Sequence, residues 1–539
     1  MKINIKEKFQ NVVFVQYVVL FIVIVSLFVF ADFDFLNKNV ATLYVINTIN
    51  NTKLEISNNI YMKDNEIYLS IEDINNNFNN SVYLDKMSRT IILTTEDEVV
   101  QFELNSTKAS VNYKVNDMKT EVYIKHNNID YINLHVLSNL YGFVVFVDSD
   151  NNVCISKEVL EGSFNKQYIN FNSICENYVR HLNSTAWNVK VVLDKLYYSK
   201  TENYYTVIMY NDEASFIGKV LKKYIDVDII QKEEDTKVVD NKFNSVIVNN
   251  TDTALDKNVE INAINLIKLS SAEGKISVVD FANTIDNVYA IYTNGYASPT
   301  YDNAITSILV QNLVNRNKNI QNIIEYVEKS GLTGVILDFR NLKVRDKVYF
   351  EQYIKELSAA LHSMNKKLMV YVRQDADYVS VRGIIPYVDN VIYVTYLNVS
   401  SMPRMAYSLT NIRDIEQSLN SLQYVINEYM FKILLEIPLY SVLWMEKNSV
   451  VTGYELYSLN AVQSFLKEND IAYYIDKTTG LNYAEFNRGN LKYKIWIEDE
   501  NSIKQKYRLA QKYMLGGIVI YKKGYESNWL YDILKGDSL

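Results

Sequence analysis

Cysteine, histidine and proline are scarce in this chain of 539 residues, which has only 2, 4 and 4 of them. The two cysteines, Cys154 and Cys175, permit one disulfide outside the cytoplasm but make no disulfide framework, and two unpaired thiols are an equally open alternative. The four histidines are scattered along the chain, so the sequence predicts no metal site and no cofactor. With 15 glycines as well, the loops must rely on asparagine, aspartate and serine.

An excess of positive charge is also missing, because the formal net charge is -8 and the isoelectric point is about 5.4. A nucleic-acid partner therefore has no electrostatic support. Hydrophobic residues make up 48% of the chain and charged residues 22%, a balance typical of globular proteins rather than disordered ones. The length predicts about two to four domains.

Residues 12–31 form an apolar run that is long enough to cross ~30 Å of hydrocarbon. Lysines precede the run and aspartates follow it, so the positive-inside rule places residues 1–11 in the cytoplasm and the bulk of the chain outside. We therefore predict a single-pass anchor in the cell membrane. Cleavage as an export signal at Val29-Phe30-Ala31 is the alternative, and it would make the protein secreted.

Residues 45–158 contain an internal repeat. Each half reads as a strand, a short helix and two strands around a polar turn, first at 66–93 and again at 129–155. This α+β repeat resembles the stalk module of bacterial envelope proteins that is also described as copper amine oxidase N-terminal-like. The resemblance implies a spacer between the membrane and the C-terminal domain, without copper chemistry.

Residues 165–231 read as short strands, and their end resembles a bacterial SH3-like domain. We expect a small all-β fold, either in contact with peptidoglycan peptides or purely structural. The charged segment after it, residues 232–240, predicts a linker.

From residue 240 to residue 539, apolar strands alternate with amphipathic helices, which is the signature of a parallel α/β fold. Eight strands with helical crossovers in about 300 residues predict a (β/α)8 TIM barrel. The fourth strand, in 331–340 (GLTGVILDFR), carries Asp338 near its C-terminal end, where barrel enzymes place catalytic carboxylates. The predicted strands are 245–248, 264–269, 288–292, 334–339, 368–372, 391–396, 433–439 and 517–521.

Five stretches of this region resemble family 18 glycoside hydrolases of the spore- and envelope-associated subgroup. The resemblance spans about residues 240–539 and implies a small α+β insertion at 450–494. The five stretches are 331–340, 392–398 (IYVTYLN), 432–440 (KILLEIPLY), 495–503 (IWIEDENSI) and 515–521 (LGGIVIY).

The resemblance implies hydrolysis of N-acetylglucosamine polymers by a substrate-assisted route, in which a glutamate protonates the leaving oxygen. By position, Arg340 replaces that glutamate, Asp338 matches the aspartate that assists the acetamido group, and Tyr396 matches the tyrosine that holds it. Leu397 replaces the acidic residue after that tyrosine. Because a guanidinium cannot act as an acid near neutral pH, we expect an Asp338–Arg340 ion pair and a catalytically impaired barrel, a pseudoenzyme. A purely structural Asp338 is the plain alternative.

Other carboxylates are candidates for a displaced acid. Glu436 falls within strand seven, where it is also a plausible salt-bridge partner of Arg340. Asp375, Asp377 and Glu446 follow strand ends and would lie in loops on the active face.

Aromatic residues at strand ends predict a sugar-stacking cleft. Tyr521 stands at the position of the family's floor tryptophan, and Trp444 follows strand seven. Because the chain has 44 tyrosines, aromatic strand ends by chance are an equally open reading. The predicted stacking residues are Tyr292, Phe339, Tyr440, Trp444 and Tyr521.

Three functions follow from these observations. The leading hypothesis is an extracytoplasmic protein that binds N-acetylglucosamine-containing envelope glycan, such as peptidoglycan or a chitin-like polymer, without hydrolysing it. The second is an active N-acetylglucosaminidase with a displaced acid. The third is a barrel that serves only protein partners in spore or envelope assembly.

Overall fold

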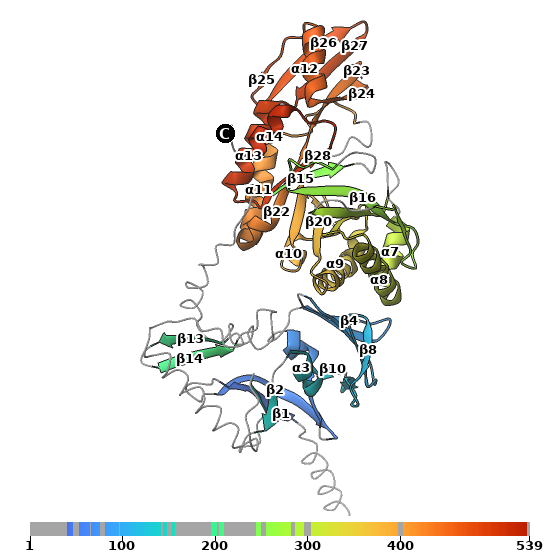
Figure 1. Ribbon diagram of the computed structural model, residues 1–539, viewed down its shortest axis with the longest axis vertical. Coiled ribbons are helices and arrows are strands. Elements are labelled where there is room, and N and C mark those ends of the chain that lie inside the picture. The colour runs from blue at the N-terminus through green and yellow to red at the C-terminus, as the bar shows by residue number, and fades with distance from the viewer. Residues whose placement is uncertain are drawn as a thin grey trace, which may run out of the picture. The chain divides into compact units, whose positions relative to one another are not determined.

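The chain divides into two compact units in a computed structural model (Figure 1). The first unit comprises residues 1–82, 102–109 and 117–235, and the second comprises 83–101, 110–116 and 236–539. The structure describes residues 40–46, 53–64, 66–75, 81–95, 97–141, 144–147, 153–156, 196–201, 204–209, 244–249, 255–281, 286–295, 303–396 and 403–535.

A seven-stranded sheet, in the order β11-β12-β1-β2-β3-β10-β9, lies in the first unit. Two short helices, α2 (Ile71–Asp73) and α3 (Leu134–Tyr141), directly follow β3 and β10. Both halves of the predicted repeat therefore begin with a strand and a helix. The strands are β1 (Val40–Ile46), β2 (Lys53–Lys63), β3 (Glu66–Ser70), β9 (Tyr123–His126), β10 (Ile129–Asn133), β11 (Val144–Val147) and β12 (Val153–Ser156).

The two strands that complete each repeat half lie in different sheets. In the second half, β11 and β12 pair within the seven-stranded sheet. In the first half, the corresponding strands begin a separate five-stranded sheet in chain order, most of which belongs to the second unit. The region 45–158 is therefore divided between the units, although it reads as one repeat. The strands of the separate sheet are β4 (Val82–Asp85), β5 (Thr90–Thr94), β6 (Val99–Glu103), β7 (Lys108–Val111) and β8 (Lys114–Asp117).

Eight parallel strands in the second unit close into a barrel, which confirms the predicted fold. Their order is β15-β28-β22-β21-β20-β19-β18-β16, and the pairing of β15 with β16 closes the ring. Every predicted barrel strand is present, and β17 (Ile276–Val278) adds an antiparallel partner to β16. The barrel strands are β15 (Asn244–Asn249), β16 (Ile261–Leu269), β18 (Val288–Thr293), β19 (Gly334–Asp338), β20 (Lys367–Arg373), β21 (Asn390–Val394), β22 (Ile433–Pro438) and β28 (Gly517–Tyr521).

Successive residues of the barrel strands face two different cores. Ile336 and Leu434 lie in the cluster that fills the barrel interior, whereas their neighbours Leu337 and Leu435 pack in the cluster shared with the helices. This alternation is the normal consequence of strand geometry. It decides which side chains at the strand ends reach the mouth of the barrel.

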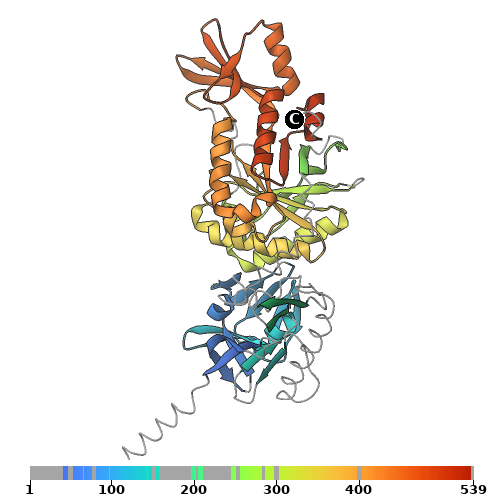
Figure 2. The ribbon, with the colours of Figure 1, turned by 90° about the vertical axis from the view of Figure 1, so that its left-hand side faces the viewer.

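Helices surround the barrel (Figure 2). Asn312 and Asn411 cap the helices that follow them, because their side chains accept hydrogen bonds from backbone amides of the first turn. The crossover between β20 and β21 is unusual, since its helix α10 has 4 residues whereas α9 has 16. The helices are α7 (Asn303–Gln311), α8 (Leu313–Lys329), α9 (Lys347–His362), α10 (Val381–Ile384), α11 (Ile412–Ile426), α13 (Glu500–Lys512) and α14 (Asn528–Leu534), with 3-10 turns η2 (Val344–Asp346) and η3 (Asn427–Lys432).

The β4–β8 sheet packs against α8 and α9 within the second unit. Ile92 and Val99 form an apolar cluster with Leu313 and Ala359. Next to this cluster, Gln101 exchanges side-chain hydrogen bonds of 2.9 and 3.0 Å with Asn317 of α8. This part of the predicted spacer is therefore an integral layer of the barrel unit.

A small α+β subdomain interrupts the barrel between β22 and α13, as the family resemblance implies. It begins at Tyr440, ahead of the predicted boundary at 450, and one helix packs against its sheet (Figure 1). Its sheet has the order β24-β23-β27-β26-β25. The elements are β23 (Tyr440–Lys447), β24 (Val450–Ser458), α12 (Leu459–Glu468), β25 (Tyr474–Asp476), β26 (Leu481–Arg488) and β27 (Leu491–Ile497).

Several predictions fall outside the described residues. These are the cytoplasmic tail at 1–11, the anchor at 12–31, Cys175 and most of the SH3-like region at 165–231. Of that last region the structure describes one antiparallel hairpin, β13 (Leu196–Thr201) and β14 (Tyr204–Met209). In the part of the chain that the structure describes, no helix is long and apolar enough to cross a membrane.

Candidate functional site

Polar side chains from four neighbouring strands meet at the C-terminal end of the barrel interior. Strands β19, β20, β21 and β22 lie side by side in the sheet, and the residues concerned occupy the inward-facing positions at or just after their ends. This is the face on which barrels of this type carry their sites. The residues of this site, here called the mouth, are Asp338, Arg340, Tyr371, Arg373, Tyr396 and Glu436.

Arg340 donates two hydrogen bonds to the Asp338 carboxylate. The distances are 2.7 Å from Nε to Oδ1 and 2.5 Å from Nη2 to Oδ2. The predicted ion pair is therefore present, and its side chains remain 17% and 10% exposed for Arg340 and Asp338. Two parallel charge-assisted hydrogen bonds of this kind are strong and directional.

The backbone of Arg340 is held in place by Asn294, the residue that follows β18. The Asn294 side chain accepts a hydrogen bond from the Arg340 amide at 3.0 Å and donates one to the Arg340 carbonyl at 2.9 Å. It also donates to the hydroxyl of Thr306 on α7 at 3.1 Å. These contacts fix the direction in which the guanidinium leaves the strand.

Glu436 is buried opposite this ion pair, inside the barrel. The Tyr396 hydroxyl donates a hydrogen bond of 2.6 Å to Glu436 Oε1. Burial raises the pKa of Glu436, although the positive charge of Arg373 and the hydrogen bonds from Tyr396 and Tyr371 oppose the rise. A carboxyl group with a raised pKa retains its proton at a higher pH and can donate it.

Tyr371 and Arg373 are residues of the mouth that the sequence interpretation missed. Arg373 donates a hydrogen bond of 3.3 Å to the Tyr396 carbonyl. Burial raises the pKa of the Tyr371 phenol well above its usual value, and the nearby charge of Glu436 adds to the rise. The alternation along β20 would have found both, because they share the inward face with Met369.

Three of the five predicted stacking residues lie in the protein core, so the predicted cleft needs correction. Tyr292 is fully buried on the outer side of β18, where Asn319 donates a hydrogen bond of 2.8 Å to its hydroxyl. Phe339 is 2% exposed and stacks on Tyr353 of α9. Trp444 lies within β23, where it is fully buried and donates a hydrogen bond of 2.8 Å to the Tyr407 carbonyl. Tyr292 and Phe339 are buried because alternation along their strands turns them to the outer side of the barrel. Trp444 is buried because the subdomain begins earlier than predicted, so this residue lies in a strand and not in a loop.

Tyr440 and Tyr521 remain as aromatic residues at the mouth. Their rings meet edge to face with centroids 6.5 Å apart. Tyr440 is buried, whereas Tyr521 is partly exposed between the barrel-interior cluster and the subdomain. Tyr521 therefore offers a surface on which a ring could stack.

The three carboxylates predicted to lie in loops differ in their position relative to the mouth. Glu446 lies in β23 of the subdomain and pairs with Lys494 at 2.9 Å. Burial opposes its ionisation, but the hydrogen bonds from Lys494 and from the Ala406 amide hold the pKa of Glu446 below its usual value. Asp375 and Asp377 are exposed in the loop after β20, with Asp375 two residues from Arg373.

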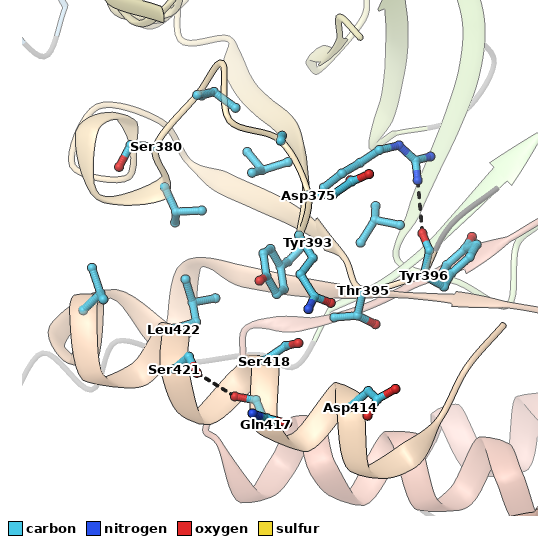
Figure 3. A pocket seen from close by; sticks show the side chains of 18 of the residues that line it. Asp375, Ser380, Tyr393, Thr395, Tyr396, Asp414, Gln417, Ser418, Ser421 and Leu422 are labelled. Atoms are coloured by element: carbon cyan, nitrogen blue, oxygen red, sulfur yellow. Dashed lines mark hydrogen bonds between the residues drawn. The ribbon is translucent and has the colours of Figure 1, made fainter. Parts of the chain in front are cut away.

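A pocket of about 910 Å³ adjoins the mouth, between the loop after β20 and helix α11 (Figure 3). Arg373 and Tyr396 line both this pocket and the mouth, whereas Asp338 and Arg340 do not line the pocket. Among the described side chains, no group of three or more His, Cys, Asp or Glu residues is placed to hold a metal ion.

The two resemblances seen in the sequence are confirmed by family models. Residues 297–526 match the model described as Glycosyl hydrolases family 18. Residues 48–156 match the model described as Copper amine oxidase N-terminal domain.

Curated relatives are bacterial proteins of low identity. The chain is 22% identical over 251 residues to the uncharacterized glycosylase YvbX of Bacillus subtilis, covering 44% of this chain and 70% of that protein. It is 24% identical over 245 residues to the cortical fragment-lytic enzyme of Bacillus anthracis, covering 42% of this chain and 54% of that one. The chain thus spans about half the length of the second relative.

Solved structures give similar matches. The spore cortex-lytic enzyme SleL of Bacillus cereus matches with a TM-score of 0.48 and 16% identity, covering 55% of this chain and 74% of that one. A chitinase from Chromobacterium violaceum matches with a TM-score of 0.48 and 16% identity, covering 55% of this chain and 99% of that one.

Proposed function

We propose that the barrel binds N-acetylglucosamine-containing envelope glycan and does not hydrolyse it by the substrate-assisted route. The observation that carries the proposal is the two-pronged Arg340–Asp338 pair. The route needs a proton donor at the position of Arg340, and a guanidinium does not release its proton at useful rates. Asp338 is already engaged by that guanidinium, so it is not free to turn towards an acetamido group.

The mouth retains what sugar binding needs. Tyr521 offers a partly exposed aromatic face, and the Asp338–Arg340 pair keeps polar groups in contact with solvent at the mouth. Relatives named as a glycosylase and as a cortical fragment-lytic enzyme support a glycan of the bacterial envelope, such as peptidoglycan. A chitin-like polymer shares the same sugar.

The place of action follows from the predicted anchor at 12–31. An N-terminal membrane helix with this charge pattern would hold the barrel on the outer side of the membrane, where envelope glycan is found. We therefore include anchoring at the cell membrane in the proposal.

Glu436 supports a second candidate function, which is hydrolysis with a displaced acid. Its raised pKa and its place inside the barrel are the properties of a proton donor. Against this, Glu436 is 5% exposed and bonded to Tyr396, so it must reach the leaving oxygen from a closed position. Hydrolysis that Glu436→Gln abolishes would establish this function.

Retention of the full chain on purified peptidoglycan and on chitin tests the proposal. We expect retention that Tyr521→Ala weakens by about tenfold, which is about 1.4 kcal/mol, because the variant removes the apolar surface that a sugar would cover. Tyr424→Ala is the matched control, since Tyr424 lies on α11 with 92% of its surface exposed. Absence of retention on both glycans would contradict the proposal.

A further inference from the structure

The pocket beside the mouth lies where one helix of the barrel has only a single turn. α10 has only 4 residues, so it covers β20 and β21 incompletely. The outward-facing side chains of Val372 and Tyr393 form part of the pocket lining, together with Leu422 from α11. A pocket of about 910 Å³ is large enough for a ligand of several linked groups.

Two buried hydroxyl oxygens in the pocket wall lack hydrogen-bond partners. They are Thr395 Oγ1, on the segment that follows β21, and Ser408 Oγ, on the approach to α11. Figure 3 shows Thr395 across the pocket from Ser418. Buried polar atoms without partners are unfavourable, so two of them in one pocket wall favour a polar ligand over an apolar one.

Charges of both signs surround the pocket. Arg373 and Arg382 stand on the side of β20 and α10, and Asp375 and Asp414 carry negative charge at its edge. Both aspartates are exposed, as is Arg382. A ligand that carries a carboxylate as well as an ammonium or amide groups would meet complementary partners here.

The pocket shares two residues with the mouth. Arg373 donates a hydrogen bond of 3.3 Å to the Tyr396 carbonyl, and both residues line the pocket while belonging to the mouth (Figure 3). The positive charge of Arg373 also acts on Glu436 inside the barrel. A group attached to a sugar at the mouth would therefore lie beside the pocket.

We propose that this pocket binds a short peptide carried by the glycan whose sugar lies at the mouth. The inference rests on the proposed glycan binding and narrows its ligand to peptide-substituted N-acetylglucosamine glycan rather than unsubstituted polymer. The peptide carboxylate pairs with Arg382 or Arg373. Rotation about χ1 of Thr395 and Ser408 turns their buried hydroxyls towards its backbone amides, and its aliphatic side chains lie on Val372 and Leu422.

Binding of three probes to the full chain in detergent tests this inference. The probes are an N-acetylglucosaminyl-N-acetylmuramic acid disaccharide carrying a tripeptide, the same disaccharide without peptide, and the tripeptide alone. We expect the first to bind about tenfold more tightly than the second, because a charge-assisted hydrogen bond contributes about 1.4 kcal/mol or more.

Two pocket variants should remove this advantage. Arg382→Ala deletes an exposed cation, and Ser418→Leu fills the pocket from α11. Each should weaken binding of the peptide-bearing probe by about tenfold and leave the peptide-free probe unchanged. Arg413→Ala and Asn420→Leu are matched controls on exposed positions of α11, and they should change neither affinity. Arg382→Ala decides the outcome if Ser418→Leu does not fold.

Equal affinity for the two disaccharides, unaffected by Arg382→Ala, would overturn the peptide pocket and leave glycan binding intact. Binding of the tripeptide alone, weakened by Arg382→Ala, together with no binding of the peptide-free disaccharide, would support the pocket and contradict the proposed glycan site. The two failures are therefore distinguishable.

Discussion

Two arginine–carboxylate pairs in the second unit differ in how deeply they are buried. Arg316 of α8 pairs with Glu356 of α9 at 3.2 Å, and both side chains are fully buried. Arg340 pairs with Asp338 at 2.5 Å, and both side chains keep some contact with solvent at the mouth. The chemistry of the groups is the same, so the difference lies in what surrounds them.

The buried pair is part of a closed network. Arg316 also donates a hydrogen bond of 2.9 Å to the Val310 carbonyl, and its Nη2 lies 3.5 Å from Oδ2 of Asp85 in the β4–β8 sheet. Gln352 donates a further hydrogen bond of 2.9 Å to Glu356. Such a network joins the sheet to the helices, and it would be costly to break. The pair at the mouth is more exposed, so we expect it to contribute less to stability than the buried pair.

Breaking the buried pair should have the largest effect. Arg316→Met leaves Glu356 without its cation in a site closed to water, and we expect it to lower the free energy of unfolding by about 3–5 kcal/mol. Urea denaturation measures this change. Arg345→Met is the matched control. Arg345 is 69% exposed, and its distance of 4.0 Å to Asp346 is long for an ion pair, so the expected loss is below ~1 kcal/mol. Equal losses in the two variants would erase the proposed distinction.

Loss of the Tyr396 hydroxyl should have a smaller effect. Tyr396→Phe removes the 2.6 Å hydrogen bond to buried Glu436, and we expect a loss of about 1.5 kcal/mol in the free energy of unfolding. Tyr424→Phe on the exposed face of α11 should be neutral. If both variants unfold at the same urea concentration as the parent, the hydrogen bond contributes nothing to stability.

Breaking the pair at the mouth should cost less again. Arg340→Ala is expected to lower the free energy of unfolding by about 1 kcal/mol or less, because the Asp338 carboxylate can be hydrated once the cation is gone. Denaturation in parallel with Arg316→Met gives the comparison directly. A loss as large as that of Arg316→Met would mean that the mouth pair is a structural element.

Restoring a carboxylate at position 340 should not restore hydrolysis. Arg340→Glu places two acidic groups two residues apart, which raises the pKa of one of them. However, Leu397 still stands where the family has the acidic residue that follows the tyrosine at position 396. We expect no release of reducing ends from N-acetylglucosamine oligomers. Ready recovery of hydrolysis would show that Arg340 alone impairs the site.

The pH dependence of stability should carry a small contribution from Glu436. Burial raises the pKa of this group, so the folded protein retains its proton where the unfolded chain, with a pKa of about 4.3, has released it. The contribution is therefore complete below that value and is lost as the pH rises through the folded pKa. Glu436→Gln cannot titrate, so the stability of the parent relative to this variant should fall with rising pH. A flat difference between the two would contradict the raised pKa.

The barrel itself could be predicted from the sequence, whereas the membership of the site could be predicted only in part. Apolar strands such as 334–339 read clearly, because each is buried on both faces. The prediction of stacking residues ignored the alternation of side chains along each strand. It therefore placed Tyr292 and Phe339 in the cleft, although both point away from the mouth. The same alternation would have found Arg373. The network around Arg316 and Asp85 joins residues far apart in the chain, and no local pattern predicts it.

Turnover and binding of peptidoglycan and N-acetylglucosamine oligomers by the full chain, measured in the same preparation, test the central claim most directly. We expect binding that Tyr521→Ala weakens, with no release of reducing ends. Hydrolysis by the parent chain that is abolished by Asp338→Asn or Glu436→Gln would contradict the claim and establish a working glycosidase.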